Sequence, residues 1–314
     1  MPSSEVSSFS DPQQYENSVR GAKLRLIVAA RGVFTAKLTK IDLGRLCMQR
    51  AHISLPTITY SALASGRTSL FLQFDPDQAP ILNSGMEVRP SEIVRYAAGS
   101  EHHYRTSGPY QCGAMSLTRE DFAQASKVLT GRELAPPETT RLVRPSAAKV
   151  GRLLQLHKAA TDLAESVPDV LAHPEVSKAI EQELIRAMIA CVRDTAPRDN
   201  GSSNRLRLHT MRRFEQLLEA RQDEPVYIPE ICAALGVTDR TLRSRCQEHL
   251  GMAPHQYLWL RRMNLAKRAL ARADPRATTV TAVANDYGFA ELGRFAVAFR
   301  KLFGESPSTT LRRV

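Results

Sequence analysis

Long apolar runs are missing from this 314-residue sequence, and so are several patterns that carry enzyme chemistry. No run reaches the ~18 apolar residues that mark a membrane-spanning helix. The polar start, MPSSEVSSFSDPQQYENS, lacks the charged and apolar regions of a signal peptide. The G-x-S-x-G, P-loop and dinucleotide-binding patterns are also absent. We therefore expect a cytoplasmic protein that has no membrane partner and is not an enzyme.

Cysteine is scarce, and its positions are scattered. The five residues are Cys47, Cys112, Cys191, Cys232 and Cys246. None belongs to a C-x-x-C pair and their number is odd, so a disulfide framework or a zinc site is not indicated. The pattern favours reduced thiols, as in the cytoplasm.

The positive charge is concentrated at one end of the chain. Lys and Arg number 43 against 32 Asp and Glu, a formal net charge of +11. From Asn204 onward there are 19 basic and 11 acidic residues, whereas the preceding 203 residues hold 24 and 21. A basic module joined to a nearly balanced one favours a polyanionic partner for the C-terminal third.

The texture of the sequence divides the chain into segments. Residues 1–20 resemble a flexible tail, and short alternating segments such as LRLIVAA and FTAKLTKIDL predict strands from Lys23 to Leu117. Helical patterns follow at about 118–130, 146–167 and 174–194. We expect a β-rich sensor and dimerisation domain over 21–195, a linker over 196–204 and a separate domain over 205–314.

A helix-turn-helix pattern lies in IPEICAALGVTDRTLRSRCQEHLG. Ile231 and Leu235 form the buried face of a short helix, and Gly236 follows where a tight turn needs a positive φ. Thr238 can then cap a second helix. Two short helices joined by such a turn predict a unit whose second helix enters the DNA major groove.

The same pattern recurs in VTAVANDYGFAELGRFAVAFRKLFGESP. Gly288 takes the turn position, and Phe295 and Phe299 share the buried face of the helix that follows. Between the two units, a segment that begins at Pro254 predicts one long helix, which would set the separation of the two reading helices.

The order of these parts resembles the DNA-binding domain of the AraC/XylS family. The resemblance covers roughly residues 206–314, a third of the chain. Its most specific positions are Gly288, Phe289, Phe295, Phe299, Arg300, Phe303, Gly304 and Pro307. It implies two reading helices that occupy successive major grooves, about 34 Å apart.

The resemblance assigns DNA contacts to both units. The base-reading positions are Arg240, Arg243 and Ser244 in the first unit and Leu292, Gly293, Ala296 and Val297 in the second. The phosphate-binding candidates are Thr238, Arg262, Arg294, Arg300 and Lys301. Arginine matches the two acceptors of guanine, whereas the second face is small or apolar and departs from many family members. We therefore expect the first unit to carry specificity, and the second to contact thymine methyls, DNA shape and phosphates.

The N-terminal part resembles the cupin-like barrel that precedes this domain in many family members. It is also distantly similar to regulators of the ethanolamine-operon type. Adjacent His102 and His103 would point to opposite faces of a strand and cannot form the H-x-H set of metal cupins, so we expect no metal and no cofactor. A nucleophile pair of Cys112 with a histidine stays open as a less favoured alternative. Weak candidates for effector binding are Arg25, Arg45, Arg50 and Tyr60.

The expected fold class is α+β, with a β-rich cupin-like domain, two following helices and an all-α double helix-turn-helix domain. The resemblance implies a homodimeric, effector-responsive transcription regulator, more often an activator, found on the nucleoid when bound. Its expected partners are double-stranded DNA, RNA polymerase and a small-molecule effector. The alternative is a constitutive regulator whose N-terminal domain only dimerises or binds a protein partner.

Overall fold

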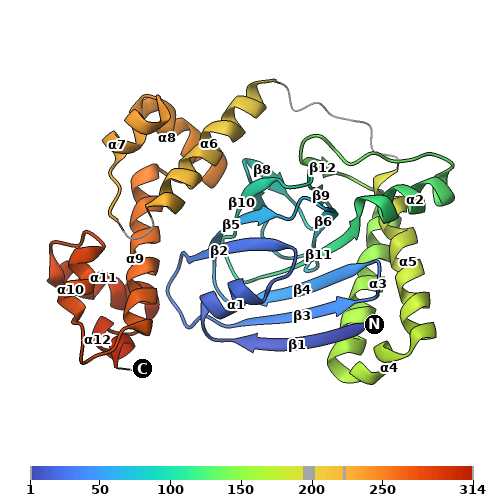
Figure 1. Ribbon diagram of the computed structural model, residues 1–314, viewed down its shortest axis with the longest axis horizontal. Helices are drawn as coiled ribbons and strands as arrows, with labels where there is room; N and C mark the ends of the chain where they lie inside the picture. The colour runs from blue at the N-terminus through green and yellow to red at the C-terminus, as the bar shows by residue number, and fades with distance from the viewer. Residues whose placement is uncertain (1, 194–201, 222–223, 313–314) are drawn as a thin grey trace.

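The computed structural model describes residues 2–193, 202–221 and 224–312. A β-rich N-terminal domain is followed by helices and then by an all-α C-terminal domain (Figure 1), which confirms the expected α+β class. Within the described residues, no helix is both long and apolar enough to cross a membrane.

Two sheets make up the N-terminal domain. The larger has the strand order β1-β3-β4-β11-β6-β9-β12 and the smaller the order β2-β5-β10-β7-β8. The strands of the larger sheet are β1 (Ser3–Phe9), β3 (Ala36–Asp42), β4 (Cys47–Ile53), β11 (Tyr110–Thr118), β6 (Arg67–Gln73), β9 (Ile93–Arg95) and β12 (Arg141–Val143). Those of the smaller sheet are β2 (Ala22–Val28), β5 (Thr57–Leu63), β10 (Glu101–Arg105), β7 (Ile81–Asn83) and β8 (Met86–Val88).

The central strands of the larger sheet are buried on both faces. In β11, Tyr110 and Cys112 belong to the core between the sheets, whereas Met115 and Leu117 belong to the core beneath the helices. Such an arrangement follows from the strand period of two, because odd and even residues point to opposite faces.

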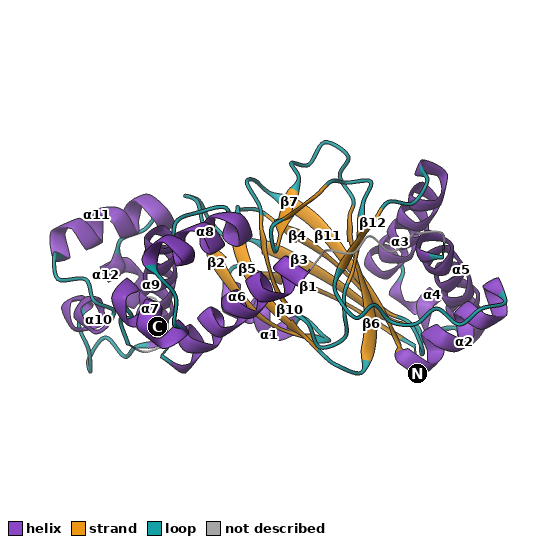
Figure 2. Ribbon diagram, turned by 90° about the horizontal axis from the view of Figure 1, so that it is seen from above, coloured by secondary structure: helices purple, strands orange, loops and turns teal. Residues whose placement is uncertain are grey.

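Helices cover the outer face of the larger sheet (Figure 2). They are α2 (Arg119–Thr130), α3 (Ala147–Ser166), α4 (Pro168–Ala172) and α5 (Pro174–Val192). Thr118 caps α2 by accepting from the Asp121 amide, and Gly131 ends it with a φ of 73°. Proline at the start of α4 and α5 suits the first helical turn, where no amide partner is needed.

Most of the expected flexible tail over residues 1–20 is instead ordered structure. β1 pairs antiparallel with β3 over its full length, and α1 (Pro12–Ser18) packs on β2 with Tyr15 buried. The polar composition suggested a tail, but β1 is an edge strand with one solvated face. Serine and glutamate on that face stay in water, so they do not destabilise the strand. Most of the expected linker over 196–204 lies outside the described residues, and α6 begins at Ser202.

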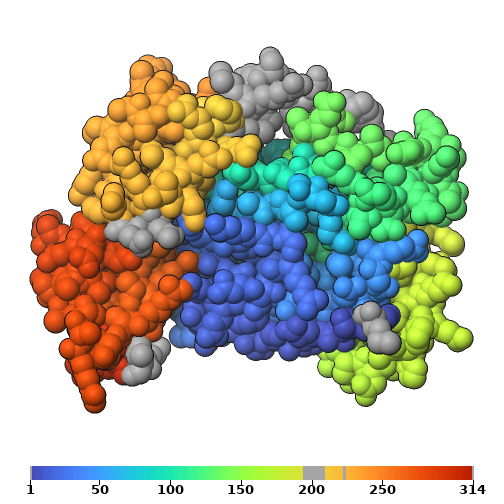
Figure 3. Space-filling view, in the orientation of Figure 1, coloured from blue at the N-terminus to red at the C-terminus, as the bar shows by residue number. Residues whose placement is uncertain are grey.

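The C-terminal domain is entirely helical. Its helices are α6 (Ser202–Ala220), α7 (Ile228–Leu235), α8 (Asp239–Leu250), α9 (Pro254–Arg272), α10 (Val280–Asp286), α11 (Leu292–Phe303) and α12 (Pro307–Leu311). One hydrophobic cluster runs from the core between the sheets into this domain. Figure 3 accordingly shows the orange and red C-terminal domain lying directly against blue residues of the N-terminal domain.

Candidate nucleic-acid interface

The first helix-turn-helix unit comprises α7 and α8. Gly236 ends α7 in the left-handed region with a φ of 66°, which a residue with a Cβ adopts only at a cost. Thr238 caps α8, since its hydroxyl accepts from the Thr241 amide at 3.2 Å. The turn and the cap together fix the direction in which α8 leaves the turn.

One face of α8 is buried and the opposite face is free. Leu242 and Cys246 are fully buried, while Arg240, Arg243 and Ser244 are exposed. Arg243 pairs with Asp239 at 2.8 Å, one helical turn earlier. A solvent-exposed pair of this kind contributes little stability, so the guanidinium is available to a stronger partner such as a guanine edge.

The second unit comprises α10 and α11. Gly288 has a φ of 73°, and a Cβ there would lie 2.9 Å from Pro225, so the turn needs glycine for both conformation and space. Phe295 and Phe299 face inward, with ring centroids 5.6 Å apart. The aromatic stack thus anchors α11 on the rest of the domain.

The outward face of α11 is apolar. Val297 is 70% exposed and Leu292 is 37% exposed. Gly293 is exposed between them, and Ala296 is half-buried. These four residues offer no hydrogen-bonding side chain for a base edge, so they match a thymine methyl better than a guanine.

Basic side chains flank the two reading faces. Arg294, Arg300 and Lys301 are exposed on α11, and Arg294 pairs with Glu291 at 2.8 Å. Arg262 differs from these three, because it donates to the Gly288 carbonyl at 3.3 Å and its burial lowers its pKa. It thus connects α9 to the second turn, and this contact makes Arg262 a poor candidate for binding phosphate.

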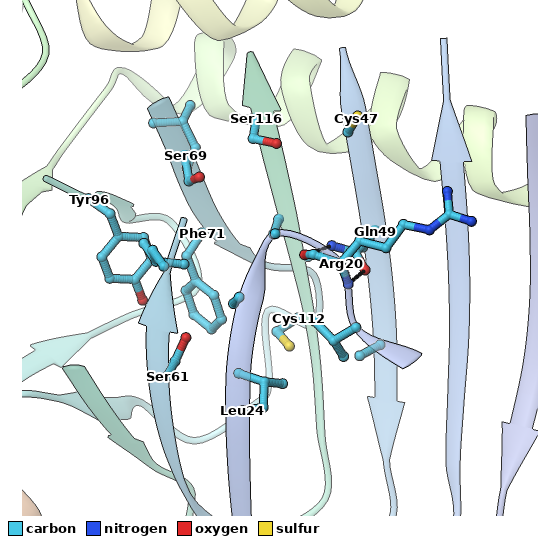
Figure 4. A pocket seen from close by; sticks show the side chains of 18 of the residues that line it. Arg20, Leu24, Cys47, Gln49, Ser61, Ser69, Phe71, Tyr96, Cys112 and Ser116 are labelled. Carbon is cyan, nitrogen blue, oxygen red and sulfur yellow. Dashed lines mark hydrogen bonds between the residues drawn. The ribbon is translucent and has the colours of Figure 1, made fainter. Parts of the chain in front are cut away.

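A cavity of about 100 Å³ lies between the sheets of the N-terminal domain (Figure 4). Its interior is apolar, with Phe71 and Tyr96 among the aromatic residues, and Arg20 and Arg67 line it as well. The Nδ1 atom of His102, another lining residue, is buried without a hydrogen-bond partner. A mostly apolar cavity with a few polar groups is typical of a small-molecule site.

The four residues that we considered from the sequence as effector ligands do not line this cavity. Arg25 pairs with Glu219, Arg45 with Glu181, and Arg50 donates to Gln111. The ring of Tyr60 packs against His103. Three of these side chains are engaged in ion pairs or hydrogen bonds elsewhere, which composition alone does not reveal.

His102 and Cys112 both line the cavity, but their chemistry does not favour catalysis. Burial raises the pKa of Cys112 to about 12 and lowers the pKa of His102 to about 3. A nucleophilic cysteine needs the opposite change, a lowered thiol pKa. Among the described residues, no three His, Cys, Asp or Glu side chains gather in a way that could hold a metal ion.

The C-terminal domain is similar to domains of known proteins. A family model described as a helix-turn-helix domain matches residues 231–313. A probable thc operon regulatory protein of Rhodococcus erythropolis is 39% identical over 97 residues, which cover 31% of this chain and 29% of that protein. The XylDLEGF operon transcriptional activator 2 of Pseudomonas putida is 31% identical over 99 residues, 32% of this chain and 63% of that protein.

A solved structure of a probable AraC family transcriptional regulator from Rhodopseudomonas palustris CGA009 is also similar. It shares 36% identity, with coverage of 33% of this chain and 96% of that one, at a TM-score of 0.30. The chain thus spans less than two thirds of the length of the two curated relatives, and the matches to them fall on about a third of it. The C-terminal domain, with its two helix-turn-helix units joined by α9, is thus an AraC-type helix-turn-helix domain.

Proposed function

We propose that the protein is a sequence-specific DNA-binding transcription regulator, most simply an activator, that works in the cytoplasm on the nucleoid. The observation that carries this proposal is the pair of exposed reading faces, on α8 and α11, within one basic domain. Relatives named as operon activators and regulators support it. We expect contact with RNA polymerase as part of activation.

The two units divide the work of DNA recognition in this proposal. Arg240 and Arg243 read base edges directly, with Ser244 beside them, because their side chains are exposed along α8. The apolar face of α11 contacts thymine methyls and DNA shape. Positioning on the phosphates falls to Thr238, Arg294, Arg300 and Lys301, which are all exposed.

Genome-wide mapping of bound sites tests this function. We expect discrete peaks that share one sequence pattern and lie next to the genes whose expression changes on deletion of the protein. Uniform coverage of the genome, with binding that weakens steeply with salt, would replace this proposal with a non-specific nucleoid role.

We further propose that the cavity between the sheets binds a small-molecule effector. Its position gives it a physical route to the C-terminal domain. Leu24, Ser61 and His102 form a row across β2, β5 and β10 and line the cavity. The next row of the same strands points the other way, toward the C-terminal domain, so a ligand that shifts this sheet also shifts that contact.

Filling the cavity is expected to abolish the response to the effector. Ser69 lines the cavity, so Ser69→Phe places a ring inside it, whereas Ser107→Phe adds the same ring to an exposed loop. A metabolite at about 100 times its Kd stabilises the protein by about 2.7 kcal/mol, which a thermal-shift screen detects. We expect the shift in wild type and Ser107→Phe but not in Ser69→Phe.

If no metabolite stabilises the wild type while dimers stay intact, the N-terminal domain only dimerises or binds a protein partner. We propose a homodimer through α3 and α5. These helices lie at the end of the molecule opposite to α10 and α11 (Figure 2), where a second copy would leave both reading faces free.

A further inference from the structure

Two arginines face each other at one edge of the larger sheet. Arg95 on β9 and Arg141 on β12 are directly opposite in the antiparallel register, and β12 is the edge strand. Ile93 and Val143, two residues along the same strands, belong to the core beneath the helices. Because side chains alternate along a strand, both arginines lie on this helix-covered face. Like charges in directly opposed positions destabilise a sheet, so another interaction must offset their repulsion.

Arg95 is held in place by its own domain. Its Nη2 donates to the carbonyl of Ala135, in the loop after α2, at 2.7 Å. Its guanidinium carbon lies 4.9 Å from the centre of the Phe122 ring on α2, which is a cation–π contact. Both contacts oppose a movement of the guanidinium away from Arg141.

Neither arginine forms an ion pair with a carboxylate among the residues that the structure describes. The Nε atoms of Arg95 and Arg141 are buried and lack a hydrogen-bond acceptor. Glu92, just before β9, is already engaged, since one of its oxygens accepts from Arg144 and the other from the Arg89 amide. Within the described part of the chain, the positive charge of the pair is therefore not neutralised.

The electrostatics of the pair agree with a missing negative charge. Burial, and then the charge of Arg141, lower the pKa of Arg95 to about 10. A carboxylate beside this guanidinium would raise the pKa instead. At neutral pH both arginines still carry their protons. Like charges that are partly removed from water are costly unless an opposite charge offsets them.

We propose that Arg95 and Arg141 together bind a small oxyanion, a carboxylate or a phosphate, from solution. The planar fork of a guanidinium donates two parallel N–H groups to such an anion, and two adjacent forks share it. Both residues are half-buried, so solvent reaches part of each. The anion supplies the missing negative charge and accepts N–H groups from both strands.

This site is separate from the cavity between the sheets. Neither Arg95 nor Arg141 lines that cavity, whereas Tyr96, the next residue after Arg95, does. Neighbours in an extended chain point to opposite faces, so the sheet separates the two sites. The oxyanion is therefore a second ligand of the N-terminal domain and does not compete with an effector for space.

A free anion suits the site better than a phosphate of bound DNA. α2, which carries the Phe122 ring over Arg95, lies at the end of the molecule opposite to α10 and α11 (Figure 2). DNA that follows the proposed reading faces is held at the other end. The site is therefore tested without DNA.

Thermal unfolding of the full chain with added oxyanion tests the site. Inorganic phosphate and acetate serve as separate probes, each titrated at constant ionic strength, which sodium chloride adjusts. At about ten times its Kd, a bound oxyanion should raise the Tm of the wild type by about 3–6 °C, and the rise should saturate. A probe that binds only the native state acts in this way.

Arg141→Gln should abolish the saturable rise, because one of the two forks is lost. In chloride alone this variant should melt no lower than the wild type, since the repulsion is lost with the charge. That comparison also shows whether the variant folds. Arg132→Gln, at an exposed position in the loop after α2, is the matched control and should keep the full rise.

A saturable rise that depends on Arg141 supports the proposal, and the probe that causes it identifies the anion as a phosphate or a carboxylate. The absence of a saturable rise with both probes would overturn the proposal. An equal rise in Arg141→Gln would overturn it as well. The test contains neither DNA nor effector, so its failure is distinct from failure of the proposed function.

Discussion

Replacing Phe299 with alanine is expected to lower the free energy of unfolding of the C-terminal domain by about 3–5 kcal/mol. Phe299 is fully buried, and its ring lies between those of Phe295 and Phe303, with centroids 5.6 and 4.7 Å away. The loss combines the transfer of the ring to water with the cavity that stays behind. Urea unfolding measures it through the single tryptophan, Trp259, which packs on the same core.

Val297→Ala is the matched control, on the opposite face of the same helix. Because Val297 is 70% exposed, we expect a change within about 0.5 kcal/mol. Similar losses for the two variants would mean that α11 is not anchored by its aromatic face, and the assignment of Val297 to the reading surface would be wrong as well.

Replacing Arg243 with alanine is expected to weaken operator binding by about 5- to 150-fold, or about 1–3 kcal/mol, and to relax the preference at one base pair. The guanidinium is exposed on α8 and pairs with Asp239 on the surface, so a guanine edge can take it over. Competition binding with operator variants, each altered at one position, measures the affinity and the base preference together.

Arg294→Ala supplies the comparison for a phosphate contact. It should weaken binding to all DNA sequences alike. The slope of the logarithm of the binding constant against the logarithm of the salt concentration should become smaller by about one. The proposal that α8 reads base edges and α11 does not would be wrong if Val297→Ala relaxed base preference and Arg243→Ala did not.

The C-terminal domain was predictable because its determinants are local. The glycines at 236 and 288 are needed for positive φ, and the spacing of Phe295 and Phe299 defines a helix face within four residues. Local turn chemistry and helical period are readable without any tertiary information. The helical period also predicts that Leu242 is buried and that its neighbour Arg243 is exposed.

The roles of buried charged residues could not be predicted in this way. Arg262 follows the polar pattern of a phosphate-binding residue, yet it bonds Gly288 across the fold. Arg25 was one of our effector candidates, and its partner Glu219 is 194 residues away in the sequence. Sequence reasoning also missed the contacts of Asn264 with Val28 and of His249 with His103, since no local pattern marks a side chain that pairs with another domain. The opposite orientation of His102 and His103, by contrast, follows from strand geometry.

Selection from a random DNA library by the purified full chain tests the central claim most directly. The proposal predicts an enriched sequence with two elements whose centres lie about one helical turn, ~34 Å, apart. The element that faces α8 should be the more strongly conserved of the two, and its preference should weaken in Arg243→Ala. Recovery of no common sequence, with binding that depends only on salt, would contradict the claim.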